Sequence, residues 1–127
     1  MPIHYRISQD EGVGYGTCKG VISLVDIRDY RSRLRADPQF VPTMNSLADF
    51  READEFEPSS SDMPSIVQDD PFGPDSRHAA GASSDTVFGK LRMYEFKADR
   101  SEAESRVFRN MADACVRLGI PRPLADH

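Results

Sequence analysis

Ile3-His4-Tyr5-Arg6-Ile7-Ser8 alternates apolar and polar side chains, the pattern of a half-buried β-strand. Asp10-Glu11-Gly12 follows with the composition of a turn, and residues 13–19 resume an extended pattern. The sequence therefore predicts a β-hairpin over residues 3–19, and every later element has to fit beside it.

A helix is predicted after the hairpin. Ser23 can accept hydrogen bonds from the free amides of the first turn, and Asp26, three residues on, completes a capping box. The helix should end near Ala36, because Asp37 precedes Pro38 and is pushed out of the helical region. Its buried stripe, which includes an arginine stem, consists of Leu24, Ile27, Arg31 and Leu34.

Two strands and a helix are predicted in the middle of the chain. Residues 44–50 form a short apolar run, typical of a central strand covered on both faces, and the small residues 78–82 indicate an inner strand. Ser84 can cap the next helix. Its expected stripe consists of Val87, Leu91 and Tyr94.

The C-terminal part should contain one more strand and one more helix. Residues 105–109 include the apolar pair Val107 and Phe108, and Asn110 can cap the last helix. Gly119, followed by Ile120 and Pro121, is a strong stop signal, because glycine readily adopts the left-handed conformation. With one short helix between residues 50 and 78 included, the order β-β-α-β-α-β-α-β-α predicts an α/β fold with a mixed, mostly parallel sheet of four to five strands and about four helices.

Size and composition narrow the class of protein. The chain has 127 residues, and we expect one domain over residues 1–127. Its net charge of -5 has the wrong sign for binding phosphates, so nucleic acid is not an expected partner. Two cysteines do not make a disulfide framework, and we find neither an export signal nor an apolar run that could span a membrane. We therefore expect a cytoplasmic protein.

The negative charge is concentrated in one region. Residues 46–85 carry ten acidic side chains and two basic ones, a net charge of -8. The other 14 basic and 11 acidic residues leave +3 on the rest of the chain. Within that region, residues 52–76 are rich in Pro and Ser. We expect an acidic surface loop there, with at most one short helix.

Several segments, taken in their order, resemble a known family. They are the hairpin that closes on Gly20, the helix ending in residues 36–40, the strand end at residues 47–51, and the closing segments at residues 88–94 and 107–110. Together they resemble the bacterial SpoIIAA-like proteins, which are grouped with STAS (anti-sigma-factor antagonist) and SEC14-like domains. The resemblance covers roughly residues 3–120, except for the acidic middle.

The resemblance implies a SpoIIAA-like (STAS-like) fold, with an antiparallel hairpin at one edge of a mixed sheet. Anti-sigma-factor antagonists carry an Asp-Ser-Ser/Thr-Gly phosphorylation loop after the central strand. The corresponding stretch here keeps serines but has no glycine after them. Ser59, Ser60 and Ser61 are therefore either caps of a short helix or regulatory phosphorylation sites.

Other candidate sites are few. The glycines of residues 12–16 lie in a hairpin, so they do not form a dinucleotide loop, and we predict no cofactor. The three histidines are far apart in sequence, so no metal site is predicted, and Cys18 and Cys115 are expected in the core. No catalytic constellation is visible.

Asp49 and Arg51 end the central strand, where open α/β sheets bind ligands, and Arg92 and Tyr94 could line the same edge.

Two functions from different classes fit these observations. The first is a non-catalytic regulatory or interaction module that binds another protein or a second copy of itself, as the STAS-like resemblance implies. The second is a carrier or sensor of a small apolar or lipid-like ligand, as the SEC14-like relation implies. A cavity beneath the outer helices would favour the second function.

Overall fold

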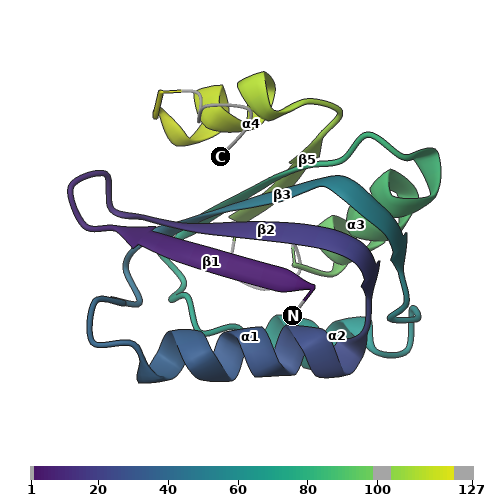
Figure 1. The fold of residues 1–127 in the computed structure, drawn as a ribbon, viewed down its shortest axis with the longest axis horizontal. Helices are drawn as coiled ribbons and strands as arrows, with labels where there is room; N and C mark the ends of the chain where they lie inside the picture. Colours follow the sequence, from purple (N-terminus) through teal and green to yellow (C-terminus); the bar gives the residue numbers. More distant parts are fainter. Residues whose placement is uncertain (1, 99–103, 122–127) are drawn as a thin grey trace.

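The computed structural model describes residues 2–98 and 104–121. The nine predicted elements occur in the predicted order (Figure 1). The strands are β1 (Ile3–Ser8), β2 (Val13–Ile22), β3 (Asn45–Phe56), β4 (Arg77–Gly81) and β5 (Glu104–Phe108). The helices are α1 (Leu24–Ala36), α2 (Met63–Gln68), α3 (Asp85–Ala98) and α4 (Met111–Leu118).

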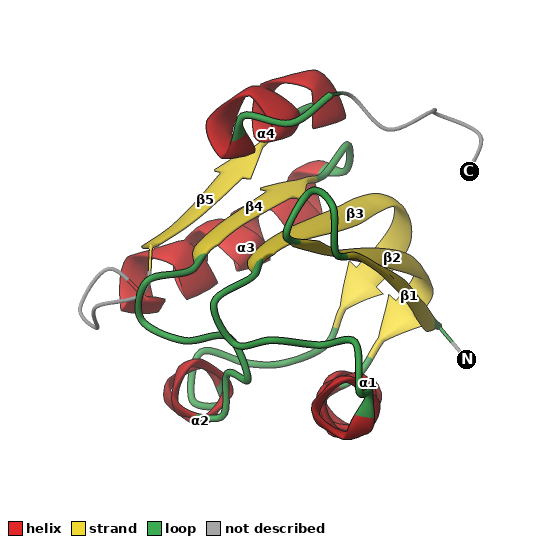
Figure 2. Ribbon diagram, turned by 90° about the vertical axis from the view of Figure 1, so that its left-hand side faces the viewer, coloured by secondary structure: helices red, strands yellow, loops and turns green. Residues whose placement is uncertain are grey.

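The strands form one sheet in the order β1-β2-β3-β4-β5. β1 pairs antiparallel with β2, and the remaining pairs are parallel. Figure 2 shows α1, α2 and α3 on one face of the sheet and α4 alone on the other. The predicted α/β architecture, with a hairpin at one edge of a mostly parallel sheet, is confirmed.

The predicted helix caps are present. The Ser23 side chain accepts from the backbone N–H of Asp26, whose carboxylate accepts in return, so the capping box is complete. Asn110 accepts from the backbone N–H of Asp113 at the start of α4. Gly119 ends α4 with a φ of 68°, in the left-handed region. Local sequence signals therefore place these helix ends correctly.

Strand β3 is longer than predicted. It runs on through residues 52–56, which the sequence analysis assigned to the acidic loop. Two register shifts against β2 each add one extra residue to β3, so these are β-bulges. They place Phe50, Ala53 and Phe56 in the same core at a spacing of three. This spacing hides the alternation by which a strand is recognised.

The rest of the acidic segment also contributes to the core. Met63 and Ile66 of α2 are buried beneath the sheet, and Phe72 is buried beside Leu34 and Met44. In the sequence, the charged residues of the segment lie before, between and after these buried apolar residues. The segment is therefore packed against the sheet face that also carries α1 and α3.

Candidate functional site

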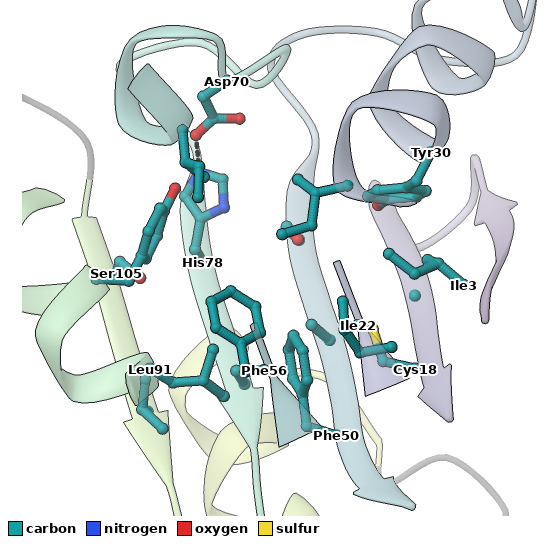
Figure 3. A pocket seen from close by; sticks show the side chains of 18 of the residues that line it. Ile3, Cys18, Ile22, Tyr30, Phe50, Phe56, Asp70, His78, Leu91 and Ser105 are labelled. Carbon is teal, nitrogen blue, oxygen red and sulfur yellow. Dashed lines mark ion pairs between the residues drawn. The ribbon is translucent and has the colours of Figure 1, made fainter. Parts of the chain in front are cut away.

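A cavity of about 120 Å³ lies between the sheet and the layer formed by α1, α2 and α3. Its floor is the sheet face opposite α4. Its roof includes Ile27 of α1, Ile66 of α2 and Leu91 of α3. The lining is mostly apolar, with polar side chains gathered toward one end (Figure 3).

Small side chains on the inner strands make room for the cavity. Gly16, Ala48 and Ala80 are aligned across β2, β3 and β4 by the parallel register, and all three line the cavity. Ala48 and Ala80 are only partly buried, although both lie on central strands covered by helices. A Cβ atom on Gly16 would lie 3.6 Å from the Tyr30 hydroxyl, so the roof does not close tightly over this row.

A polar row lies beside this small row. Ser46 of β3, His78 of β4 and Ser105 of β5 are direct register partners and line the cavity, two residues before Ala48, Ala80 and Val107. Successive residues of a strand point to opposite faces, so a step of two keeps both rows on one face. In the other direction the lining continues to Cys18 and Phe50. The floor thus changes from polar to apolar along the strands.

His78 and Asp70 form the charged centre of the polar end. Nε2 of His78 lies 3.0 Å from Oδ2 of Asp70, and both side chains are largely buried. Figure 3 shows the imidazole reaching from β4 toward Asp70, which follows α2. The Phe72 ring packs edge-on against the imidazole, with the ring centroids 5.2 Å apart.

The ionisation of Asp70 follows from its neighbours. Burial raises the pKa of Asp70, but the contact with His78, the charge of Arg31 and the Phe72 N–H outweigh it and hold the pKa below the usual value. The carboxylate is therefore ionised at neutral pH. It presents a fixed negative charge to one side of the imidazole.

Arg31 and Tyr94 complete the polar end from the helix side. The Arg31 guanidinium donates to the carbonyl of Ile66, and its second terminal nitrogen lies 3.5 Å from the Tyr94 hydroxyl. Burial raises the pKa of Tyr94, so its hydroxyl keeps its proton. The one buried arginine of the described residues is thus held by protein groups and balances the charge of Asp70.

Some polar atoms at the cavity have no hydrogen-bond partner among the described residues. They include both ring nitrogens of His78, of which Nε2 is buried and contacts Asp70 only as an ion pair, and the hydroxyls of Tyr30 and Ser46; all three residues line the cavity. In Figure 3 the second ring nitrogen of His78 is turned toward the apolar side chains. Buried polar atoms are usually paired, so such atoms beside an empty volume indicate a site for a small molecule or for water.

Asp49 and Arg51 have a local structural role. Asp49 accepts from the backbone N–H of Arg51 at 3.0 Å and from its guanidinium at 2.7 Å. Arg51 lies in the first bulge of β3, where its backbone has no partner in β2. Asp49 is opposite Thr17, two residues after the pair of Leu47 and Tyr15 beneath α4, so it lies on the α4 face.

Arg92 and Tyr94 are separated from that pair and from each other. Tyr94 lines the cavity on the opposite face of the sheet from Asp49. The Arg92 side chain is 58 % exposed and reaches Glu95 at 3.9 Å. The four residues predicted to share one edge therefore do not form one site.

Ser59, Ser60 and Ser61 are exposed just before α2. The Asp62 carboxylate accepts from the backbone N–H of Ser59 at 2.9 Å and from its hydroxyl at 3.0 Å. These hydrogen bonds lower the pKa of Asp62. The serine side chains do not cap α2, because Asp62 itself is the N-cap residue.

The remaining sequence candidates lie as follows. Cys18 and Cys115 are both buried, on opposite faces of the sheet. Residues 2–98 and 104–121 contain no cluster of three or more His, Cys, Asp or Glu side chains that could hold a metal ion. None of the helices in this part of the chain is long and apolar enough to cross a membrane.

Sequence reasoning missed the polar end of the cavity. The sequence patterns place His78 and Ser46 in strands and Asp70 in the acidic loop and assign none of them to a site; of the residues at the polar end, only Tyr94 is among the predicted candidates. One signal was available, since Ser46 and Ala48 alternate with Leu47 within a predicted central strand. The contact between Asp70 and His78 carries no such signal, because the acidic segment folds back onto β4 only in three dimensions.

A similar solved structure shows which fold the chain has. It is the crystal structure of an uncharacterised protein from the DUF3478 family with a SpoIIAA-like fold, from Shewanella loihica PV-4. The two share 18 % sequence identity with a TM-score of 0.59, and the match covers 91 % of each chain. No protein-family model and no curated protein matches the sequence. The resemblance found in the sequence is confirmed at the level of architecture, and the chain has a SpoIIAA-like fold.

Proposed function

We propose that this protein is a non-catalytic binding protein for a small, mainly apolar molecule that carries one polar group. One observation supports this proposal above others: the cavity under the three helices is apolar along most of its length and has unpaired polar atoms at one end. Ligand sites are typically apolar pockets with a few placed polar groups.

The volume of the cavity sets the size of the ligand. An engineered apolar cavity of about 150 Å³ in another protein holds benzene. A cavity of about 120 Å³ therefore suits a single ring or a short chain. A diacyl lipid is several times larger, so within the predicted class of apolar ligands we favour the smallest members.

NMR titration with benzene and phenol as probes tests this proposal. We expect saturable chemical-shift changes at amides of β3, β4 and α3 that line the cavity. A cavity-filling variant, Ala80→Val, should weaken binding of both probes at least several-fold, because its extra methyl groups occupy the floor.

Ala112→Val is the matched control, since it adds the same atoms on α4, on the other side of the sheet. It should bind both probes as the parent does. The proposal fails if neither probe gives saturable shifts in the cavity, or if Ala80→Val and Ala112→Val bind them equally well.

A regulatory role is a second proposal, and the exposure of Ser59, Ser60 and Ser61 favours it because a kinase can reach these hydroxyls. Added phosphate would repel Asp62, which already accepts from Ser59, and would loosen the start of α2. Incubation with extract of the source cell and ATP, followed by intact-mass measurement, tests this. An unchanged mass would remove the proposal.

Protein partners stay a prediction. The STAS-like resemblance implies another protein or a second copy of this chain, and the expected location is the cytoplasm. Pull-down from the source cell, with sedimentation of the purified chain, tests the partner. A strictly monomeric chain that captures no protein reproducibly would count against an interaction module.

A further inference from the structure

The two ring nitrogens of His78 have different surroundings. Nε2 lies 3.0 Å from Oδ2 of Asp70 as an ion-pair contact without hydrogen-bond geometry, whereas Nδ1 has no polar contact among the described residues and faces the cavity. An ionised carboxylate has no proton to donate, so it can interact favourably only with a protonated ring nitrogen. The negative charge 3.0 Å from Nε2 therefore favours the tautomer that carries the proton on Nε2.

This tautomer determines what Nδ1 offers to a ligand. In a neutral imidazole with the proton on Nε2, Nδ1 has a lone pair and accepts. Asp70 stays ionised because His78, Arg31 and the Phe72 N–H together lower its pKa, against the opposing effect of burial. The cavity thus presents a directed acceptor at its polar end.

The neighbouring groups limit the ligand further. The Ser46 hydroxyl, in register with His78, has no hydrogen-bond partner among the described residues and can donate or accept. The Arg31 guanidinium already donates to Ile66, and Asp70 balances its charge. A ligand anion would meet the fixed charge of Asp70 with no free cation at the polar end among the described residues.

We propose that the cavity selects a small hydroxyl compound of the phenol or alcohol class, whose O–H donates to Nδ1 of His78 while its apolar body lies over Ala48 and Ala80. Asp70 is a positioning residue, because it acts only through the tautomer of His78. This inference rests on the proposed binding function and adds the chemistry of the ligand to it.

Three probes of nearly equal size separate binding of any small apolar molecule from selection of a hydroxyl compound. Phenol carries a donor, fluorobenzene replaces it with a group that cannot donate, and benzene has neither group. At about pH 8, above the range in which imidazoles usually take up a proton, we expect phenol to bind about tenfold more tightly than fluorobenzene or benzene. Benzoate should bind more weakly than phenol.

Asp70→Asn tests the positioning role. An amide can donate to Nε2, so the proton of His78 is no longer restricted to that nitrogen and the preference for phenol should shrink several-fold. Asp69→Asn is the matched control, because Asp69 pairs with Arg35 at 3.1 Å outside the cavity lining. It should keep the preference of the parent.

The ¹⁵N chemical shifts of the imidazole give a readout independent of binding. We expect the protonated nitrogen to be Nε2 in the parent and in Asp69→Asn, and a mixture of tautomers in Asp70→Asn. Backbone amide spectra with the dispersion of the parent show separately that each variant is folded.

The outcomes are distinguishable. If none of the probes binds in the cavity, the binding function itself fails. If benzene, fluorobenzene and phenol bind with equal affinity, the cavity binds apolar molecules and its polar atoms only hold water, so the hydroxyl inference is wrong. Protonation of Nδ1 in the parent, or an unchanged phenol preference in Asp70→Asn, would also overturn it.

Discussion

The two faces of the central sheet differ in how well they are filled. Under α4, β2 and β3 present the large side chains of Val13, Tyr15 and Leu47, which are buried against the helix. On the opposite face the same strands present Gly16, Ser46 and Ala48 beneath three helices, and a cavity results. The difference depends on which alternate residues are large. A single strand can therefore serve a solid core on one side and a binding site on the other.

Changing side-chain volume should therefore matter most on the face beneath α4. Leu47 is 1 % exposed, and Leu47→Ala should lower the free energy of unfolding by about 2–5 kcal/mol, because it opens a new void. Ala48→Val, the next residue on the cavity face, should change it by less than about 1 kcal/mol, since added methyl groups enter existing space. Urea unfolding of both variants measures this. Equal losses would remove the distinction between the faces.

The two cysteines probe both faces chemically. Burial, together with the charge of Asp49, raises the pKa of Cys18 to about 12 from the usual 9.0. Only the thiolate reacts, so Cys18 should react about a thousand times more slowly than an exposed thiol even with a reagent small enough to enter the cavity. Cys115 belongs to α4, is buried between that helix and the sheet, and should be protected by exclusion.

Alkylation kinetics of Cys18→Ser and Cys115→Ser, with mass spectrometry, separate the two thiols. Both thiols should react at the ordinary rate after unfolding in urea. Fast native labelling of Cys18 would contradict the pKa argument.

Alanine substitutions at two glycines form a matched pair, and both should change stability less than Leu47→Ala does. A Cβ atom at Gly81 would lie 2.6 Å from Met111 Sδ and 3.3 Å from the Asn110 backbone, so Gly81→Ala should destabilise by about 1–3 kcal/mol. At Gly16 the nearest atom would be 3.6 Å away, so Gly16→Ala should be neutral or slightly stabilising. Thermal unfolding compares them. A larger loss at Gly16 would mean that the cavity face is filled.

The smallest expected effect is the acid dependence of stability. The native pKa of Asp70 lies below its usual value of 3.8, so ionised Asp70 stabilises the fold above pH 3.8, and this contribution is lost as the pH falls through the native pKa. The stability difference between the parent and Asp70→Asn should therefore shrink as the pH is lowered below that value. Asp69→Asn serves as the control for charge alone. A difference independent of pH would contradict this interpretation.

Much of the fold could be predicted because its signals are local. The capping box at Ser23, the Asn110 cap and the stop at Gly119 depend on residues within a few positions of each other, and all three are confirmed. The extension of β3 through residues 52–56 could not be predicted, because the two bulges are visible only against β2. Strand pairing between distant segments decides such a register.

The candidate site also combines features that local sequence predicts with features that depend on contacts between distant segments. Short-range patterns in the chain identify the hairpin, the order of nine elements and the apolar stripes of α1 and α3. Helix and strand periodicity depends only on residues close together in the sequence. The juxtaposition of Asp70 and His78, and the row of Ser46, His78 and Ser105, exist only once three parallel strands are in register and the acidic segment folds over them. Those contacts join residues far apart in sequence, so packing in three dimensions, and no local preference, creates the cavity and its polar end.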